Sequence, residues 1–172
     1  MCAESRKESM LVTVTGYRDS GKTTAVERIV RELTGRGYRI GTFKHCHHGF
    51  DLDQPGKDSW RHRHSGTVGT VLMAPTGFAL VGDHPGEDDP RELMKWLLPD
   101  VDLVLAEGFH WLPTPRIEIA ERDGSTRPAH TDGEAVASLR ALFNQQDIIR
   151  VCDLLEKRFL GHSESRPVEP GG

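Results

Sequence analysis

Cysteine is scarce in this sequence, and long apolar runs are missing from it. The 172 residues include three cysteines, Cys2, Cys46 and Cys152, which lie far apart in the chain. An odd number of cysteines at such spacing is not the pattern of a disulfide framework. No apolar run approaches the roughly 20 residues of a membrane-spanning helix, and the polar start MCAESRKES lacks the apolar core of a signal peptide. We therefore expect a cytoplasmic protein with no membrane partner.

An excess of charge of one sign is also missing. The formal net charge is −4 and the isoelectric point is about 6.1, so the chain lacks the basic surface that nucleic-acid binding requires. Hydrophobic residues make up 36% of the sequence, enough for a buried core at this length. We predict one domain over residues 10–160, between disordered tails at 1–9 and 161–172.

Apolar and β-branched segments alternate with segments of helical character. Strands are predicted at 10–15, 38–44, 67–73, 77–81, 101–106, 116–120 and 135–139, and helices at 22–34, 59–64, 89–98 and 147–159, the last capped by Asp147. This order predicts an α/β fold with a mostly parallel sheet flanked by helices. Ligands of such sheets bind at the carboxyl ends of the strands, where Thr15, Lys44 and Ala106 end three apolar segments.

A phosphate-binding motif follows the first predicted strand. The segment Gly16-Tyr17-Arg18-Asp19-Ser20-Gly21-Lys22-Thr23 fits G-x-x-x-x-G-K-[ST], and its position between a strand and a helix is the one this motif requires. The glycines let the backbone amides turn towards phosphate, and the helix that follows presents its N-terminus to the same anion. Lys22 is expected to reach the β- and γ-phosphates and Thr23 to bind Mg²⁺. The motif predicts a phosphate-loop NTPase fold.

An acidic residue ends the apolar strand VDLVLA. Glu107 stands where a metal-bound water needs a carboxylate opposite a phosphate loop. The N–H of Gly108, the next residue, is placed to meet the γ-phosphate. Asp102 lies at the entrance of the strand, away from the nucleotide.

A long polar loop follows the second predicted strand, and ordered loops of this length are often functional. It carries three acids for Mg²⁺ or water and three cations for phosphate, namely Asp51, Asp53, Asp58, Lys57, Arg61 and Arg63. Its histidines and Cys46 are bunched, without a Cys-x-x-Cys pair, so a transition-metal centre is disfavoured. Contact of His45 or His47 with phosphate or a partner is the preferred interpretation.

The segment Asn144-Gln145-Gln146-Asp147 is faintly similar to the Asn-Lys-x-Asp guanine reader of many GTPases. It lacks the lysine, and the segment SLRALF before it is not a clean strand. A helix cap at Asp147 is therefore preferred over recognition of a base.

Three blocks of this sequence together resemble the molybdopterin-guanine dinucleotide biosynthesis protein B (MobB) family. They are GYRDSGKTT, FKHCHHGFDLDQPGKDSWRHRHSG, and DLVLAEGFH followed by PRIEI. The second block is the most specific, because a phosphate loop alone occurs in many families. The resemblance spans Leu11–Phe159.

This resemblance implies a function as well as a fold. Members bind GTP with Mg²⁺, hydrolyse it weakly and usually form homodimers. They assist the molybdenum cofactor guanylyltransferase, which joins GMP to molybdopterin, and molybdopterin-bearing enzymes are further candidate partners. The resemblance implies phosphate contacts from Gly16, Ser20, Gly21, Lys22, Thr23 and Thr24, and Mg²⁺-linked roles for Thr23 and Glu107. It also makes Asp58 and the 44–48 stretch, including Lys44 and His45, part of the site.

The chain departs from the family pattern inside the phosphate loop. Tyr17, Arg18 and Asp19 stand where small residues are common. Arg18 adds a possible phosphate contact, and Asp19 adds a negative charge that disfavours phosphate unless it points away. We include all three among the predicted nucleotide-binding residues, with Glu107 and Asp58 as the predicted catalytic pair and metal ligands beside Thr23.

Two other classes of function remain open from the residues alone. A small-molecule kinase would use the acidic loop to orient an acceptor hydroxyl, although no arginine-rich lid follows the fourth strand. A nucleotide-dependent metal-delivery protein would use His45, His47 and His48 to bind nickel or zinc.

Overall fold

The fold was analysed in a computed structural model that describes residues 10–47, 49, 54–82, 89–126 and 133–161. The chain divides into two compact units, a larger one of Met1–His45 and Asp89–Gly172 and a smaller one of Cys46–Asp88. The predicted tails lie outside the described residues apart from Gly161, and the single domain over 10–160 stays a prediction beside this division. None of the helices in the described part of the chain is long and apolar enough to cross a membrane.

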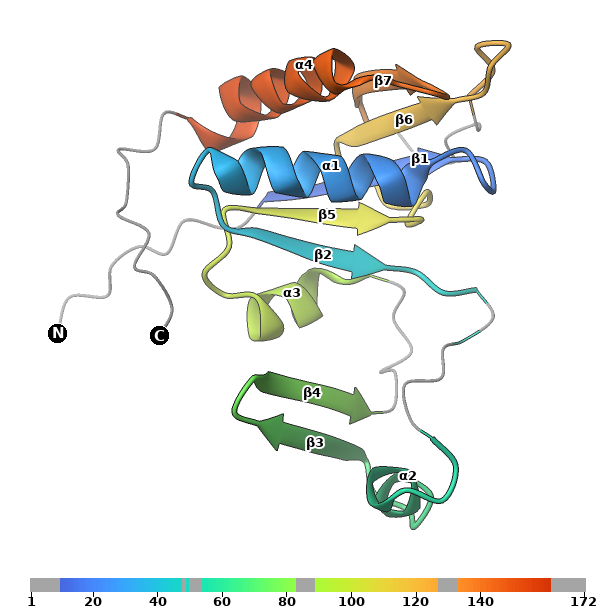
Figure 1. Cartoon of the computed structure of the whole chain (residues 1–172), viewed down its shortest axis with the longest axis vertical. Helices are drawn as coiled ribbons and strands as arrows, with labels where there is room; N and C mark the ends of the chain where they lie inside the picture. The colour runs from blue at the N-terminus through green and yellow to red at the C-terminus, as the bar shows by residue number, and fades with distance from the viewer. Residues whose placement is uncertain (1–9, 48, 50–53, 83–88, 127–132, 162–172) are drawn as a thin grey trace, which may run out of the picture. The chain divides into compact units, whose positions relative to one another are not determined.

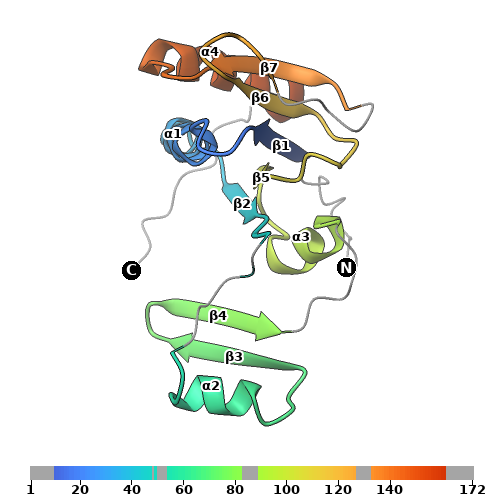
Figure 2. The same cartoon turned by 90° about the vertical axis from the view of Figure 1, so that its right-hand side faces the viewer.

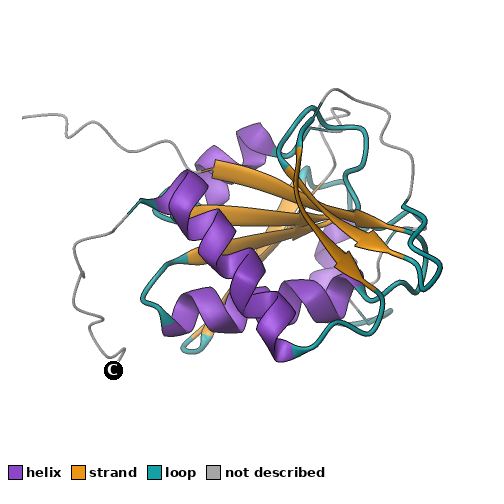
Figure 3. Cartoon of the chain, turned by 90° about the horizontal axis from the view of Figure 1, so that it is seen from above, coloured by secondary structure: helices purple, strands orange, loops and turns teal. Residues whose placement is uncertain are grey.

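A five-stranded sheet forms the centre of the larger unit (Figure 1). Its order is β2-β5-β1-β6-β7 and every neighbouring pair is parallel. The strands are β1 (Met10–Gly16), β2 (Ile40–Lys44), β5 (Leu103–Glu107), β6 (Arg116–Ala120) and β7 (Ala135–Arg140). The strand arrowheads point to one edge, where loops gather (Figure 3). The predicted α/β class with a mostly parallel sheet is confirmed.

Helices cover both faces of this sheet, and each face has its own apolar core. On one face lie α1 (Lys22–Gly35) and α4 (Gln145–Leu155), the latter continued by a π-helical turn over Glu156–Leu160. On the other lies α3 (Arg91–Leu97) (Figure 2). Its Met94 packs with Leu11 and Val104. Because helices cover both faces of the sheet, Leu103–Ala106 of β5 are fully buried, and both faces of the strand are apolar.

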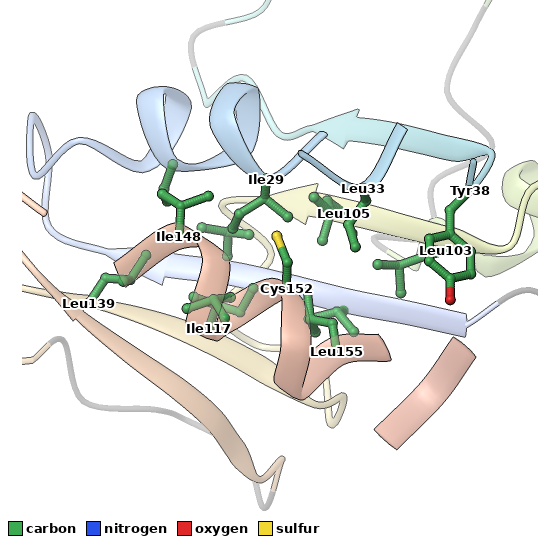
Figure 4. Packing of buried hydrophobic residues seen from close by; sticks show 14 of the residues in the cluster. Ile29, Leu33, Tyr38, Leu103, Leu105, Ile117, Leu139, Ile148, Cys152 and Leu155 are labelled. Carbon is green, nitrogen blue, oxygen red and sulfur yellow. The ribbon is translucent and has the colours of Figure 1, made fainter. Parts of the chain in front are cut away.

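The larger core joins α1 to α4 over the sheet (Figure 4). Ala25, Ile29 and Leu33 recur every fourth residue along α1, so they form one stripe that is fully buried. Ile148 and Leu155 of α4 meet this stripe, and each such side chain contributes about 1.5–3 kcal/mol by leaving water. Cys152 lies in the same core, where burial raises the pKa of its thiol to about 12.

A cluster of charged side chains links the C-terminal end of α1 to the C-terminal end of α4. The Arg36 guanidinium lies 3.0 Å from Glu32, 2.7 Å from Asp153 and 2.8 Å from Glu156. The buried Tyr38 hydroxyl donates to Glu156 at 2.6 Å. This hydrogen bond, with Arg36, holds the pKa of the Glu156 carboxyl below its ordinary value.

The beginning of α4 differs from the predicted one. Asn144, not Asp147, is the N-cap, and its side chain accepts the Asp147 N–H at 3.1 Å. The Asp147 carboxylate accepts the Asn144 N–H in return, at 3.0 Å. This reciprocal pair is a capping box with aspartate in the third position. The α-helical part also ends at Leu155, before the predicted Phe159.

The smaller unit contains a helix and a hairpin. Its elements are α2 (Asp58–Arg63), β3 (Gly69–Ala74) and β4 (Gly77–Gly82), and β3 pairs with β4 in antiparallel register. The predicted turn at Ala74-Pro75-Thr76 is confirmed between the two strands. Large apolar side chains remain exposed on the hairpin, namely Val71, Leu72, Met73, Phe78 and Leu80.

The Tyr38–Glu156 hydrogen bond predicts a pH-dependent stability. Because the folded pKa of Glu156 is lowered from 4.5, its contribution is complete above about pH 5 and is lost as the pH falls through the lowered value. Tyr38→Phe should therefore reduce the free energy of unfolding by about 1 kcal/mol at pH 7 and by less at pH 3. Urea unfolding at both pH values measures the difference. An equal reduction at both would show that the hydroxyl does not stabilise the carboxylate.

Candidate functional site

The phosphate loop connects β1 to α1 at the carboxyl edge of the sheet, as predicted. Gly21 is the N-cap of α1 with φ 95°, a left-handed conformation that favours glycine. At Gly16, an added Cβ would lie 2.8 Å from the carbonyl oxygen of Ile119 and 2.7 Å from Ser20 Oγ, so only glycine fits. No acidic residue stands in the first turn of α1, which leaves its N-terminus suited to an anion.

Thr23, Glu107 and Lys44 converge beside the loop. Thr23 Oγ1 donates to Glu107 Oε1 at 2.8 Å. Lys44 Nζ lies 3.3 Å from Thr23 Oγ1 and 3.4 Å from Glu107 Oε1. The convergence follows from the sheet, because Lys44 and Glu107 are register partners at the ends of β2 and β5. The Glu107 side chain is only 12% exposed, whereas that of Lys44 is 56% exposed.

The donor set of this cluster fits Mg²⁺. A threonine hydroxyl and a carboxylate are hard oxygen ligands of the kind that magnesium prefers, and magnesium usually keeps several waters beside them. Both groups stand next to the N-terminus of α1, where phosphate oxygens would complete the coordination. Lys22 Nζ donates to the carbonyl oxygens of Gly16 and Tyr17, so its ammonium group lies over the phosphate loop.

The three unusual loop residues are Tyr17, which contacts another segment, and Arg18 and Asp19, which pair with each other. The Tyr17 hydroxyl donates to the Thr126 carbonyl at 3.4 Å, linking the phosphate loop to the segment after β6. Arg18 and Asp19 form a 3.6 Å ion pair with both side chains 91% exposed, a type of pair that adds little stability. Asp19 has φ 59°, a left-handed conformation that aspartate tolerates better than most residues.

His45 and Gly108 lie next to each other at the ends of β2 and β5. The His45 N–H donates to the Glu107 carbonyl at 3.0 Å, and its ring packs edge-on against Phe109 and Trp111. The Gly108 N–H, predicted to meet the γ-phosphate, donates to the Val14 carbonyl at 3.1 Å. In this structure Gly108 therefore connects β5 to β1, and a Cβ at Gly108 would lie 3.5 Å from His45 Cβ.

Thr24 lies in the first turn of α1, in the larger unit. The other predicted site residues belong to the smaller unit or lie outside the described residues. Asp58 begins α2, where it lies 4.0 Å from Arg61 with its side chain 93% exposed. Its role at the nucleotide, like those of Lys57, Arg61 and Arg63, stays a prediction. Asp51, Asp53 and His48 are not among the described residues. In the part of the chain that is described, no group of three or more His, Cys, Asp or Glu side chains is arranged to hold a metal.

Sequence reasoning missed a pocket of about 690 Å³ on the side of the phosphate loop next to β6 and β7. Its lining includes Gly21 and Arg28, with Glu121 after β6 and Leu142 and Phe143 after β7. The rule applied to Thr15, Lys44 and Ala106 would also have selected Glu121 and Leu142, since both follow the carboxyl ends of parallel strands. The nearby Asn144 and Asp147 serve the helix cap.

Comparison with known proteins gives a consistent result along most of the chain. Residues 11–142 match the family model of MobB, described as molybdopterin guanine dinucleotide synthesis protein B. The chain is 32% identical over 156 residues to the molybdopterin-guanine dinucleotide biosynthesis adapter protein of Haemophilus influenzae, covering 85% of this chain and 87% of that protein. It is 34% identical over 118 residues to the Escherichia coli K12 protein of the same name, covering 67% of each chain.

Solved structures show the same fold. A crystal structure of molybdopterin-guanine biosynthesis protein B superposes with a TM-score of 0.67 at 24% identity, covering 85% of this chain and 97% of that one. Bacillus subtilis MobB superposes with a TM-score of 0.64 at 23% identity, covering 86% and 98%. With the phosphate loop, the Thr23–Glu107 pair and the sequence match in agreement, the chain belongs to the MobB family of molybdopterin guanine dinucleotide synthesis proteins.

Proposed function

We propose that this protein is a GTP-binding adapter with weak GTPase activity in molybdenum cofactor biosynthesis. It assists the attachment of GMP to molybdopterin, which forms molybdopterin-guanine dinucleotide. The observation that carries the proposal is the convergence of Thr23, Glu107 and Lys44 beside the phosphate loop, in a chain related to proteins named as biosynthesis adapters.

The site residues divide by the part of Mg²⁺–GTP that they contact. The loop amides, Lys22 and Lys44 bind phosphate oxygens, while Thr23 and Glu107 bind Mg²⁺ directly or through water. Asp58 is the proposed second acid of the site, in addition to Glu107. The nucleotide-binding set is Gly16, Tyr17, Arg18, Asp19, Ser20, Gly21, Lys22, Thr23, Thr24, Lys44, His45 and Gly108.

The charges around the phosphate loop agree with weak GTP hydrolysis. Fast phosphoryl transfer needs a cation at the developing charge on the γ-phosphate, often an arginine. Arg18, the arginine of the loop itself, is paired with Asp19 and 91% exposed. The partner guanylyltransferase is the proposed source of a residue that completes the site, and molybdopterin-bearing enzymes are further partners.

Self-association is the second part of the proposal. An isolated two-stranded hairpin is marginal in water, yet β3 and β4 expose a cluster of large apolar side chains. Met73 and Phe78 are cross-strand partners, 86% and 71% exposed. We propose that a second copy of the chain covers this hairpin in a homodimer.

The cytoplasm is the proposed compartment. Cys46 is exposed and Cys152 is buried, and both are free thiols. Free thiols persist where the compartment is reducing, which agrees with a biosynthetic role inside the cell.

Replacing Lys22 tests the function directly. Lys22→Ala removes the charged donor that reaches the phosphates and should weaken GTP binding about 10- to 100-fold by calorimetry. It should also abolish the increase in dinucleotide formation that the wild-type protein causes in a reaction of purified guanylyltransferase, GTP and molybdopterin. Lys157→Ala, an exposed lysine of the same unit, is the matched control. Unchanged GTP affinity in Lys22→Ala would reject the phosphate-loop assignment.

Glu107→Gln tests the magnesium role. The amide oxygen can still accept the Thr23 hydroxyl, so the fold and GTP binding should be nearly maintained, while the lost charge weakens the hold on Mg²⁺ and its water. GTP hydrolysis should slow by about tenfold or more and need higher Mg²⁺. Single-turnover hydrolysis and GTP affinity are measured across a Mg²⁺ titration. Equal loss of binding and turnover would argue against a catalytic role.

The homodimer proposal has its own test. Met73→Lys places a charge in the exposed apolar cluster and should shift the protein from dimer to monomer in sedimentation analysis. Thr76→Lys, in the turn of the same hairpin, is the control and should stay dimeric. A dimer that persists in Met73→Lys would exclude the hairpin as the interface.

A further inference from the structure

The pocket described above adjoins the phosphate loop. Ser20 and Gly21 belong to both the loop and the pocket lining. The pocket is therefore within reach of the remainder of a nucleotide whose phosphates bind the loop amides. The pocket volume of about 690 Å³ is within the range of small-molecule sites.

The aromatic residue Phe143 forms part of one wall of the pocket. A Cβ built on Gly21 would lie 3.6 Å from Phe143 Cε1, so the ring lies close to the loop backbone. The Arg28 guanidinium lies 5.5 Å from the centroid of the ring, and Arg28 Nη1 donates to the Phe143 carbonyl at 3.3 Å. A planar base packed against such a ring gains about 1–3 kcal/mol.

The neighbouring rim carries a strained leucine. Leu142 has φ 71°, a left-handed conformation that is a genuine outlier for a bulky side chain. Its side chain is 79% exposed although it is large and apolar. Strain of this kind collects at ligand sites, and an apolar ligand face beside Leu142 would remove its side chain from water.

Three carboxylates line the pocket, those of Asp19, Glu121 and Asp123. Asp19 forms an ion pair with Arg18 at 3.6 Å. Asp123 accepts the Ser125 N–H at 2.8 Å and thereby holds the turn after β6. Glu121 uses its backbone in the same turn, donating to the Ser125 carbonyl and accepting the Gly124 N–H. The half-buried Glu121 side chain makes no hydrogen bond or ion pair within the described ranges.

We propose that this pocket seats the guanine base of the nucleotide, with Phe143 and Leu142 packing on the base and Glu121 accepting its N1–H and 2-amino groups. The proposal rests on the proposed GTP-binding function and names its specificity residue. A carboxylate has two acceptor oxygens, which match the two donors on that edge of guanine. Adenine presents an unprotonated nitrogen at the same position, so an unpaired acceptor would face the carboxylate.

Glu121→Gln tests the assignment by reversing the preference for the base. The amide keeps one acceptor for N1–H but turns a donor towards the 2-position, where guanine has an amino group and xanthine has a carbonyl. Affinity for Mg²⁺–GDP should fall about tenfold or more, and affinity for Mg²⁺–xanthosine diphosphate should rise above that of the wild type. Calorimetry with GDP, ADP and xanthosine diphosphate measures the change, and the gain for xanthosine diphosphate also shows that the variant is folded.

Two comparisons separate failure of this proposal from failure of GTP binding. Mg²⁺–tripolyphosphate, which has no base, should bind wild type and Glu121→Gln equally and bind Lys22→Ala weakly. Asp123→Asn should keep the preference of the wild type for GDP. Unchanged GDP binding in Glu121→Gln, or a reversal of preference in Asp123→Asn instead, would overturn the Glu121 assignment while leaving the phosphate loop intact. A wild-type protein that binds neither GDP nor tripolyphosphate would overturn the proposed function itself.

Discussion

Parallel hydrogen bonding of β1 to both β5 and β6 is the constraint on which the site depends. It sets Val14 opposite Glu107 on one side and Gly16 opposite Ile119 on the other. The carboxyl ends of all three strands therefore meet at one edge, with the phosphate loop between them. The close approach of Gly16 to the Ile119 carbonyl shows how little room this pairing leaves, since any side chain at Gly16 would separate β1 from β6.

Charge compensation at that edge explains why a nearly buried carboxylate is tolerated. A buried charge is costly unless it is paired and hydrogen-bonded. Glu107 has both, with the Thr23 hydroxyl at 2.8 Å and the Lys44 ammonium at 3.4 Å. A divalent cation would compensate the charge of Glu107 more strongly than Lys44 does. At the proposed site, Mg²⁺ would therefore replace the Lys44 ammonium as the cation beside Glu107. Lys44, which is more than half exposed, can turn towards phosphate oxygens as that exchange occurs.

The parts of this site that could be predicted from sequence are those encoded within short segments. The loop lies in one motif, and Glu107 ends one apolar run, so the strand, the loop and the carboxylate beside the loop can all be predicted from short segments. The strand-end rule also selects Glu121 and Leu142 as candidates, but it does not predict the pocket that they line, which depends on the register of β6 with β7 and its irregularity between Arg116 and Ile117. The left-handed backbone of Leu142 is likewise a product of tertiary contacts, since leucine has no local preference for it. The capping box at Asn144 lies within four consecutive residues, and the prediction assigned the cap to Asp147, the third helical residue, instead of Asn144.

A nucleotide whose base and phosphates are both bound need not be hydrolysed rapidly. Contacts to the base and to the α- and β-phosphates are equally strong in the ground state and in the transition state, so they raise affinity without lowering the barrier. Only groups that meet the developing charge at the γ-phosphate accelerate its transfer. In the larger unit the base pocket and the loop would supply mainly the first kind of contact. The weak turnover and the adapter role of the proposed function thus have one physical origin, which is a site built to retain GTP until a partner completes it.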